Sequence, residues 1–151
     1  MARIRKILVA YDGSPQSKEA LAWAVDLSLL NKAQVCVAKV IEAMSIAEMT
    51  ALYEAGSGDD LVAYIEEVKA TDRRLLEDAI ATIGQRKGVA ITTALLNGNI
   101  AAALINYAKE TGMDMIVAGT KGHGALEGLL MGSVTRHLVS LSPIPVLVVK
   151  D

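Results

Sequence analysis

Glycine residues gather after an apolar stretch near the end of the chain, in a pattern suited to binding a phosphate. Residues 113–118 have the composition of a buried strand, and Gly119, Gly122, Gly132 and Ser133 follow it. Glycine lets the backbone approach a ligand closely and adopt positive φ at little steric cost. A short helix is predicted directly after Ser133, and the N–H groups at a helix start attract anions. The pattern predicts an anion site, with Ser133 as the N-cap of that helix.

Two charged or titratable side chains between these glycines could add to the site. Lys121 could pair with a phosphate as a point charge, and His123 could donate a hydrogen bond to a phosphate oxygen. There is a plainer interpretation, because glycines also serve tight turns and His123 could simply be exposed to solvent. The clustering of glycines next to a helix start favours the phosphate site.

A carboxylate stands at the end of the first apolar stretch. Residues 4–11 predict a buried strand, and Asp12 opens the turn that follows. At that place Asp12 could hydrogen-bond a ribose or help to hold a divalent cation beside phosphates. It could equally form an Asx turn with Gly13. The residues alone leave both interpretations open.

Strands alternate with helices along the chain, which favours a parallel sheet with helices on both faces. Strands are expected over residues 4–11, 35–41, 89–96, 113–118 and 144–149, and helices over 15–31, from 59 or 60 to about 84, over 100–111 and over 134–141. The expected N-caps are Ser14, Asp59 or Asp60, and Asn99, and Gly112 is the expected stop of the third of these helices. In the first helix, Ala20, Ala24, Leu27 and Leu30 are expected to form the apolar face. Residues 42–60 are the hardest to interpret, although Met44, Ile46, Met49 and Leu52 suggest a short helical piece.

Composition sets limits on the class of protein. A length of 151 residues with 52% hydrophobic and 21% charged residues predicts one globular domain over residues 1–151, and 3% aromatics predict an aliphatic core. With a net charge of −2 and no cluster of Lys and Arg, we expect no nucleic-acid partner. No stretch approaches the ~20 apolar residues of a membrane span. The single Cys36 sits in an apolar strand, so we expect a buried thiol and a cytoplasmic location.

Other site motifs are missing from the sequence. Gly119 and Gly124 have the gap of a Walker A loop, but Ala125 follows where that motif requires Lys. His123, His137 and Cys36 do not have the spacing of metal ligands. No pair of nucleophile and base stands out, and Ser14 and Ser133 are both explained as caps.

The glycine spacing, the opening stretch 7–14 and the closing Pro-Val-Leu-Val-Val together resemble the ATP-binding branch of the universal stress protein family. The resemblance covers nearly the whole chain and is weakest over 42–60. It implies a Rossmann-like, open five-stranded parallel sheet of order 3-2-1-4-5, in which the Asp12 turn and the Gly119 loop face one crevice. It also implies an adenine beside Val40, contacted mainly through the backbone. The residues implied for the site are Tyr11, Asp12, Gly13, Val40, Gly119, Lys121, Gly122, His123, Gly132, Ser133, Val134 and Thr135, with Val117 and Ala118 as weaker candidates.

From this resemblance we expect an adenine-nucleotide-binding protein that holds ATP, or ADP or AMP, with Mg²⁺ on the phosphates and Asp12 as a candidate metal ligand. Nucleotide occupancy would order residues 42–60 or an interface, and so switch the binding of an unknown partner in a stress response. The alternatives are an interaction module of the same fold that binds no nucleotide, and a slow ATPase, for which no residue plainly orients a water. The resemblance also implies a homodimer through residues 144–149, a predicted edge strand that needs a cover.

Overall fold

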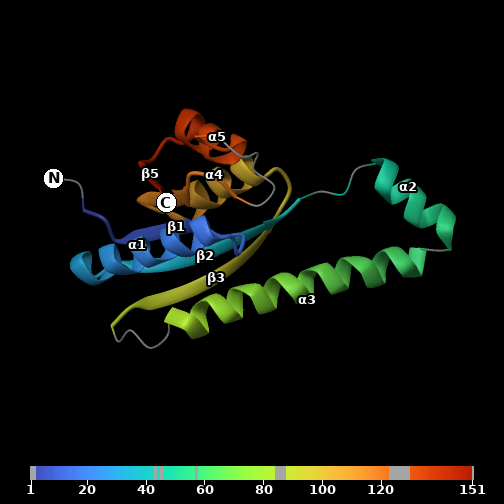
Figure 1. Cartoon of the computed structure of the whole chain (residues 1–151), viewed down its shortest axis with the longest axis horizontal. Helices are drawn as coiled ribbons and strands as arrows, with labels where there is room; N and C mark the ends of the chain where they lie inside the picture. Colours follow the sequence, from blue (N-terminus) through green and yellow to red (C-terminus); the bar gives the residue numbers. More distant parts are fainter. Residues whose placement is uncertain are drawn as a thin grey trace.

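The computed structural model describes residues 3–42, 44, 46–56, 58–83, 88–122 and 130–150, and these residues form alternating strands and helices (Figure 1). The elements are β1 (Lys6–Ala10), α1 (Pro15–Asn31), β2 (Gln34–Ile41), α2 (Ile46–Ala55), α3 (Gly58–Ile83), β3 (Ala90–Asn97), α4 (Ile100–Thr111), β4 (Met115–Gly119), α5 (Ser133–Leu141) and β5 (Val146–Val149). No helix among the described residues is both long enough and apolar enough to span a membrane.

The five strands form one parallel sheet of order β3-β2-β1-β4-β5, which confirms the predicted order. β1 lies between β2 and β4, and the chain leaves β1 toward one side and returns to the other. The carboxyl ends of all five strands therefore meet at one edge, with the reversal of strand order at β1. β3 and β5 are the outer strands of the sheet within the described residues.

Helices cover both faces of the sheet because successive strand residues point to opposite sides. Ile7 and Val9 of β1 pack against α1 and α3 on one face. Leu8 lies between them in sequence and packs against α4 and α5 on the other face. Cys36 of β2 is buried on that second face, as predicted. With side chains buried in both directions, the central strands are apolar throughout.

Capping residues define α1 and α4 where the sequence predicts them. The Ser14 hydroxyl accepts a hydrogen bond from the Ser17 N–H (3.2 Å), and the Asn99 side chain accepts one from the Ala102 N–H (3.1 Å). Gly112 ends α4 with a positive φ of 68°, a conformation in which glycine carries no Cβ penalty.

The predicted apolar face of α1 is wrong at one residue. Ala20 and Ala24 are fully buried and Leu27 packs against the same core, but Leu30 is 82% exposed. Leu30 follows Ala24 by six residues, which is about one and two-thirds turns, so it points away from the sheet. Trp23, on the same helix, is 52% exposed.

The long helix α3 begins earlier than predicted. It starts at Gly58, so Asp59 and Asp60 lie in its first turn and neither is the N-cap. Acidic side chains there still face the positive end of the helix dipole. The predicted helical piece in 42–60 is α2, which has no buried residue and packs against α3. Figure 1 shows α2 and the first half of α3 extending well beyond the sheet; we call residues 46–68 the arm.

Candidate functional site

A cavity of about 430 Å³ opens at the carboxyl ends of β1, β2 and β4. This is the edge at which an open parallel sheet binds ligands, beside the reversal of strand order. Most residues predicted for the site lie in its wall: Tyr11, Asp12, Val40, Gly119, Lys121, Gly122, Gly132, Ser133, Val134 and Thr135. Gly13 is not among the lining residues, and His123 lies outside the described residues.

Of the two weaker candidates, Ala118 lines the cavity, whereas Val117 points into the core between the sheet and α1. The prediction missed several further lining residues: Ala10, Ser17, Ala38, Lys39, Glu42, Ile100 and Leu104. Ile100 and Leu104 are one turn apart on α4, directly after its cap, so their shared face could have been inferred. Lys39 could not, because its surroundings depend on how α3 docks.

One backbone carbonyl of β2, that of Val40, lies past the end of β1 and bonds a side chain. The Tyr11 N–H donates to the Ala38 carbonyl oxygen (2.9 Å), the last step of the β1–β2 ladder. Carbonyls two residues apart on a strand point the same way. The Val40 carbonyl therefore points toward β1 but lies past its end. Its hydrogen-bond partner is the Lys39 ammonium, with Nζ 3.1 Å from the oxygen.

Asp12 forms the Asx turn that the sequence allowed. Its Oδ1 accepts a hydrogen bond from the Ser14 N–H (2.9 Å), and its own N–H donates to Ser17 Oγ (3.4 Å). These bonds fix the carboxylate at the cavity wall, half-buried between the start of α1 and the glycine loop. The turn and a ligand contact are compatible, since a carboxylate has a second oxygen with its own lone pairs.

Gly119 and Gly122 allow close packing and do not serve an unusual backbone conformation. A Cβ on Gly119 would lie 2.7 Å from Gln16 Cβ and 3.0 Å from its backbone carbonyl, so this glycine lets α1 pack on the end of β4. A Cβ on Gly122 would lie 2.5 Å from Asp12 Oδ2. Neither residue has the positive φ that the sequence interpretation expected; Gly13 does, at 83°. Gly13 therefore serves the turn, beneath the side chain of Leu75.

The start of α5 differs by one residue from the prediction. Gly132 is the N-cap, with no side-chain cap bond, and Ser133 is the first helical residue, so the predicted N-cap is wrong. The Gly132 N–H donates to the Thr120 carbonyl oxygen (2.7 Å), which holds Gly132 in an extended conformation, so the helix begins at the next residue, one earlier than predicted. The N-cap Gly132 therefore offers no side-chain bond to the first N–H groups of α5, and the residues that carry these groups line the cavity.

The Thr135 hydroxyl has a structural task. It is buried, and its Oγ1 donates to the Gly119 carbonyl oxygen (2.7 Å). This bond ties the first turn of α5 to the end of β4, so the helix start is held at a fixed place beside the loop.

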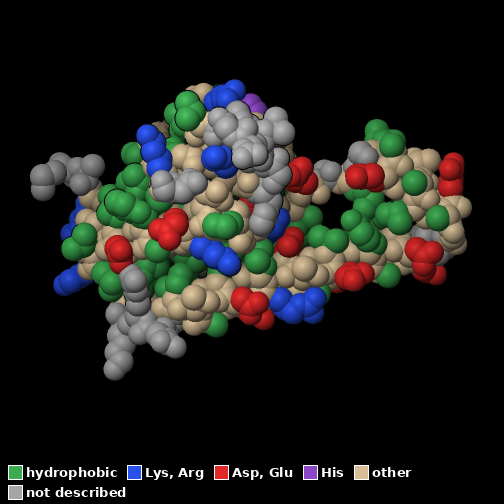
Figure 2. Space-filling model, in the orientation of Figure 1, with side chains coloured by type: hydrophobic (Ala, Val, Ile, Leu, Met, Phe, Trp, Pro, Cys, Tyr) green, Lys and Arg blue, Asp and Glu red, His purple; other side chains and the backbone are tan. Residues whose placement is uncertain are grey.

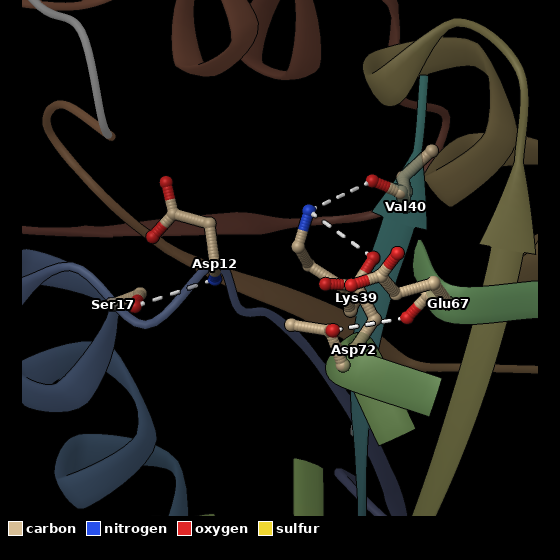
Figure 3. A network of polar contacts seen from close by, with 7 residues as sticks. Asp12, Ser17, Lys39, Val40, Glu67 and Asp72 are labelled. Carbon is tan, nitrogen blue, oxygen red and sulfur yellow. Dashed lines mark hydrogen bonds and ion pairs between the residues drawn. The ribbon is translucent and has the colours of Figure 1, made fainter. Parts of the chain in front are cut away.

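Within the described part of the chain, two cationic and two anionic side chains line the cavity: Lys39, Lys121, Asp12 and Glu42. Lys39 Nζ lies 4.0 Å from Asp72 Oδ2 of α3, and both side chains are largely buried. Figure 3 shows the Lys39 ammonium between Val40 and Asp72, with Asp12 on the neighbouring turn after β1. No group of three or more His, Cys, Asp or Glu among the described residues could hold a metal ion by itself.

Tyr11 also lines the cavity, and its buried surroundings and nearby charges shift its pKa. Burial raises the pKa of the phenol above its ordinary value, and the charges of Asp12 and Asp78 raise it further. The ring belongs to the core between the sheet and the helices α1 and α3. Tyr11 thus remains a neutral, packed element of the cavity floor at physiological pH.

Comparison with known sequences gives a match over nearly the whole chain. The sequence model described as the universal stress protein family matches residues 3–150. Universal stress protein YxiE of Bacillus subtilis is 33% identical over 146 residues, which is 96% of this chain and 98% of the relative.

The fold is also similar to solved structures. UspA from Lactobacillus plantarum aligns with a TM-score of 0.74 at 24% identity over 99% of both chains. A universal stress protein in complex with cAMP aligns at 0.69 and 21% identity, over 99% of this chain and 98% of that chain. The universal stress protein from Archaeoglobus fulgidus in complex with dAMP aligns at 0.65 and 18% identity over 98% of both. At these identities the likeness shows the fold.

Proposed function

Since the chain belongs to the universal stress protein family, we propose that it binds an adenine nucleotide in the cavity at the carboxyl ends of β1, β2 and β4. The ligand is ATP, or its products ADP or AMP. The observation that carries this proposal is the convergence of three features on one cavity: the glycine loop, the uncapped start of α5 and the Asp12 carboxylate. Two proteins of similar fold are complexes with the adenine nucleotides cAMP and dAMP, which supports the ligand class.

The phosphates would lie between the glycine loop and α5. The first N–H groups of α5 lack a side-chain cap, and the positive end of the helix dipole faces the same space. Lys121 adds a cationic side chain to this end of the cavity. Gly122 and Gly132 carry no side chain there, so the backbone can approach the phosphate oxygens.

The base and the ribose would lie on the other side, over the end of β1 and beside β2. Val40, Ile100 and Leu104 give that side apolar walls suited to a flat ring. Asp12 lies between the proposed phosphate side and the proposed base side of the cavity, where it could accept a hydrogen bond from a ribose hydroxyl. Mg²⁺ usually takes one or two carboxylates together with phosphate oxygens, so Asp12 and the nucleotide would hold it together.

The arm is the best candidate for reporting nucleotide occupancy to a partner. It carries exposed apolar side chains, among them Ile46 (80%), Tyr53 (70%) and Val62 (60%). Figure 2 shows such side chains on both of its helices, with Asp and Glu side chains along it. Glu42, in the cavity wall, lies just before the arm in sequence, and Asp72 of α3 meets Lys39. Binding in the cavity would thus bias the arm, and the arm would bind an unidentified protein in a stress response.

We further propose that the protein is a cytoplasmic homodimer that pairs through β5. β5 is an outer strand of the sheet in the described part of the chain, and three of its four residues are only partly buried. Val139 and Leu141 of the adjoining α5 are 50% and 67% exposed. A second copy would cover the strand edge and this apolar surface.

A denaturing release experiment tests the nucleotide proposal directly. The purified protein is unfolded, and the supernatant is analysed for nucleotides by chromatography and mass spectrometry. Refolded or nucleotide-free protein is then titrated with ATP, ADP and AMP, each with Mg²⁺ and with EDTA. We expect saturable binding of at least one of them. No bound nucleotide and no binding at millimolar MgATP would favour an interaction module of the same fold.

Phosphate release under multiple turnover separates a binding protein from a slow ATPase. Phosphoryl transfer needs a positioned water and charge stabilisation in line with the leaving group. Among the lining residues Asp12 and Glu42 are the groups that could accept a proton from water. Release that exceeds one equivalent and is lost in Asp12→Asn would establish the enzymatic alternative.

A further inference from the structure

The side of the cavity away from the glycine loop holds a donor and an acceptor next to each other. Val40 offers a carbonyl oxygen past the end of β1, and the Lys39 ammonium lies 3.1 Å from it. Both residues line the cavity. Figure 3 shows Lys39 Nζ close to the Val40 oxygen.

The strand order of the sheet determines how far Lys39 and Val40 lie from the proposed phosphate site at the loop after β4. β2 and β4 are on opposite sides of β1, and adjacent strands lie about 4.8 Å apart, so the ends of β2 and β4 are roughly 10 Å apart. A ligand whose phosphates sit at the loop after β4 would therefore bring its base, not its phosphates, to β2. The apolar side chains of Val40, Ile100 and Leu104 line the cavity there.

The bond between Lys39 and Val40 leaves both groups able to bind a base. A carbonyl oxygen has two lone pairs and an ammonium has three N–H donors. Asp72 Oδ2, 4.0 Å from Nζ, holds the ammonium near this place from the α3 side. Lys39 and Asp72 are 22% and 15% exposed, so solvent competes little for the ammonium.

We propose that Lys39 is a specificity-determining residue that reads the purine base. Its ammonium donates to the ring nitrogen, N1 or N7, that flanks the 6-amino group, while the Val40 carbonyl accepts from that amino group. The proposal rests on the proposed function, because it assigns the base end of the same nucleotide site. Adenine carries an acceptor on either side of its amino donor, so one donor and one acceptor side by side match its edge.

The test measures the dissociation constants of AMP, 1-deaza-AMP and 7-deaza-AMP. The proteins are the wild type, Lys39→Met, which keeps the length of the side chain without its charge, and Lys39→Gln, which keeps a neutral donor. Lys109→Met, an exposed lysine outside the cavity, is the matched control for lost charge. Far-UV circular dichroism and thermal unfolding without ligand check that each variant folds.

One of the two deaza analogues lacks the nitrogen that accepts from Lys39. In the wild type we expect AMP to bind roughly tenfold more tightly than that analogue, which is the effect of one hydrogen bond to a charged group. In Lys39→Met that preference disappears, because AMP falls to the affinity of the analogue. Lys39→Gln keeps part of the preference, and Lys109→Met keeps all of it. The analogue that loses affinity identifies N1 or N7 as the partner.

Two results would overturn the proposal while leaving nucleotide binding intact. One is a wild-type preference that persists in Lys39→Met. The other is an equal weakening of AMP and both analogues, which indicates a general electrostatic or structural role. Contact with a phosphate instead would show as a loss in Lys39→Met that grows from adenosine to AMP to ATP. If the wild type binds none of these ligands, the proposed function itself fails.

Discussion

Asp12 and Gly122 both line the cavity, and the Asp12 carboxylate lies where a side chain on Gly122 would begin. A Cβ built on Gly122 would lie 2.5 Å from Asp12 Oδ2 and 3.5 Å from Cγ. Asp12 cannot easily swing aside, because its Oδ1 accepts the Ser14 N–H in the turn that begins α1. Glycine is therefore favoured at position 122 by the nearby Asp12 carboxylate rather than by a positive φ.

Replacing Gly122 with Val should abolish nucleotide binding and leave the fold largely intact. The side chain would push Gly122 and the carboxylate apart, and Gly122 is exposed rather than part of the core. The readout is thermal unfolding with and without MgATP. Ligand at 100 times its dissociation constant stabilises a native state by about 2.7 kcal/mol. We expect that stabilisation in the wild type and none in Gly122→Val.

Ser133→Ala is the companion variant for this measurement. Because Gly132 is the N-cap, the substitution removes no cap bond, and alanine is a good helix former, so we expect little change in stability without ligand. Its shift with MgATP should be smaller than that of the wild type but clear. If Gly122→Val shifts as much as the wild type, the phosphates bind elsewhere than at this loop.

Asp12→Asn should keep the turn at the start of α1 and remove the contribution of Mg²⁺ to nucleotide binding. The amide oxygen of Asn can still accept the Ser14 N–H, so the unfolding free energy should fall by no more than about 1 kcal/mol. A neutral amide is a poorer Mg²⁺ ligand than a carboxylate. Calorimetric titration with ATP should then show that Mg²⁺ strengthens binding in the wild type and not in the variant. An equal effect of Mg²⁺ in both proteins would remove Asp12 from the metal site.

Local signals predicted those parts of the fold that depend on neighbours in sequence. Ser14 and Asn99 cap helices because each is followed by a helix that needs its N–H groups satisfied, and Gly112 ends a helix by its own conformational freedom. Ser133 carries the same signal, yet it is not the cap, because a tertiary hydrogen bond from Gly132 to Thr120 fixes where α5 begins.

The candidate site likewise combines residues that could be predicted from the sequence with residues whose role depends on tertiary contacts. The glycine spacing and the strand end at Asp12 mark two walls of the cavity, and both could be read from the chain. Lys39 could not, because a lysine at a strand end is usually solvated, and only the docking of α3 brings Asp72 to it. The reason for Gly119 was also hidden, since the backbone of Gln16 that requires it lies more than a hundred residues earlier.

Tyr11 should make the protein sensitive to alkaline pH. Its folded-state pKa is raised by burial and by Asp12 and Asp78, whereas an unfolded tyrosine titrates near pH 10. The folded state then binds the proton more tightly than the unfolded state, so its contribution to stability is complete below pH 10 and is lost as pH rises through the folded pKa. Denaturant unfolding from pH 8 to 11 should show a shallower loss in Tyr11→Phe than in the wild type. Tyr53→Phe, at an exposed position, is the control and should follow the wild type.

Dimer formation through β5 can be tested at one backbone N–H. The carbonyl oxygens of Pro145 and Val149 accept from Ile116 and Thr120 of the β4 side, so odd-numbered residues of β5 point their backbone groups inward. Val148 lies between them and points its N–H to the open edge. Val148→Pro removes that N–H without removing a bond to β4, and edge strands tolerate proline at such positions.

Light scattering at micromolar concentration should report a dimer for the wild type and a monomer for Val148→Pro. Val148→Ala shortens the side chain but keeps the N–H, and it serves as the control for the loss of side-chain contacts. We expect it to remain dimeric. Circular dichroism confirms that the proline variant keeps its sheet and helices. A monomeric wild type would refute the dimer. A dimeric Val148→Pro would move the interface away from the β5 edge, with the exposed Val139 and Leu141 of α5 as the next surface to substitute.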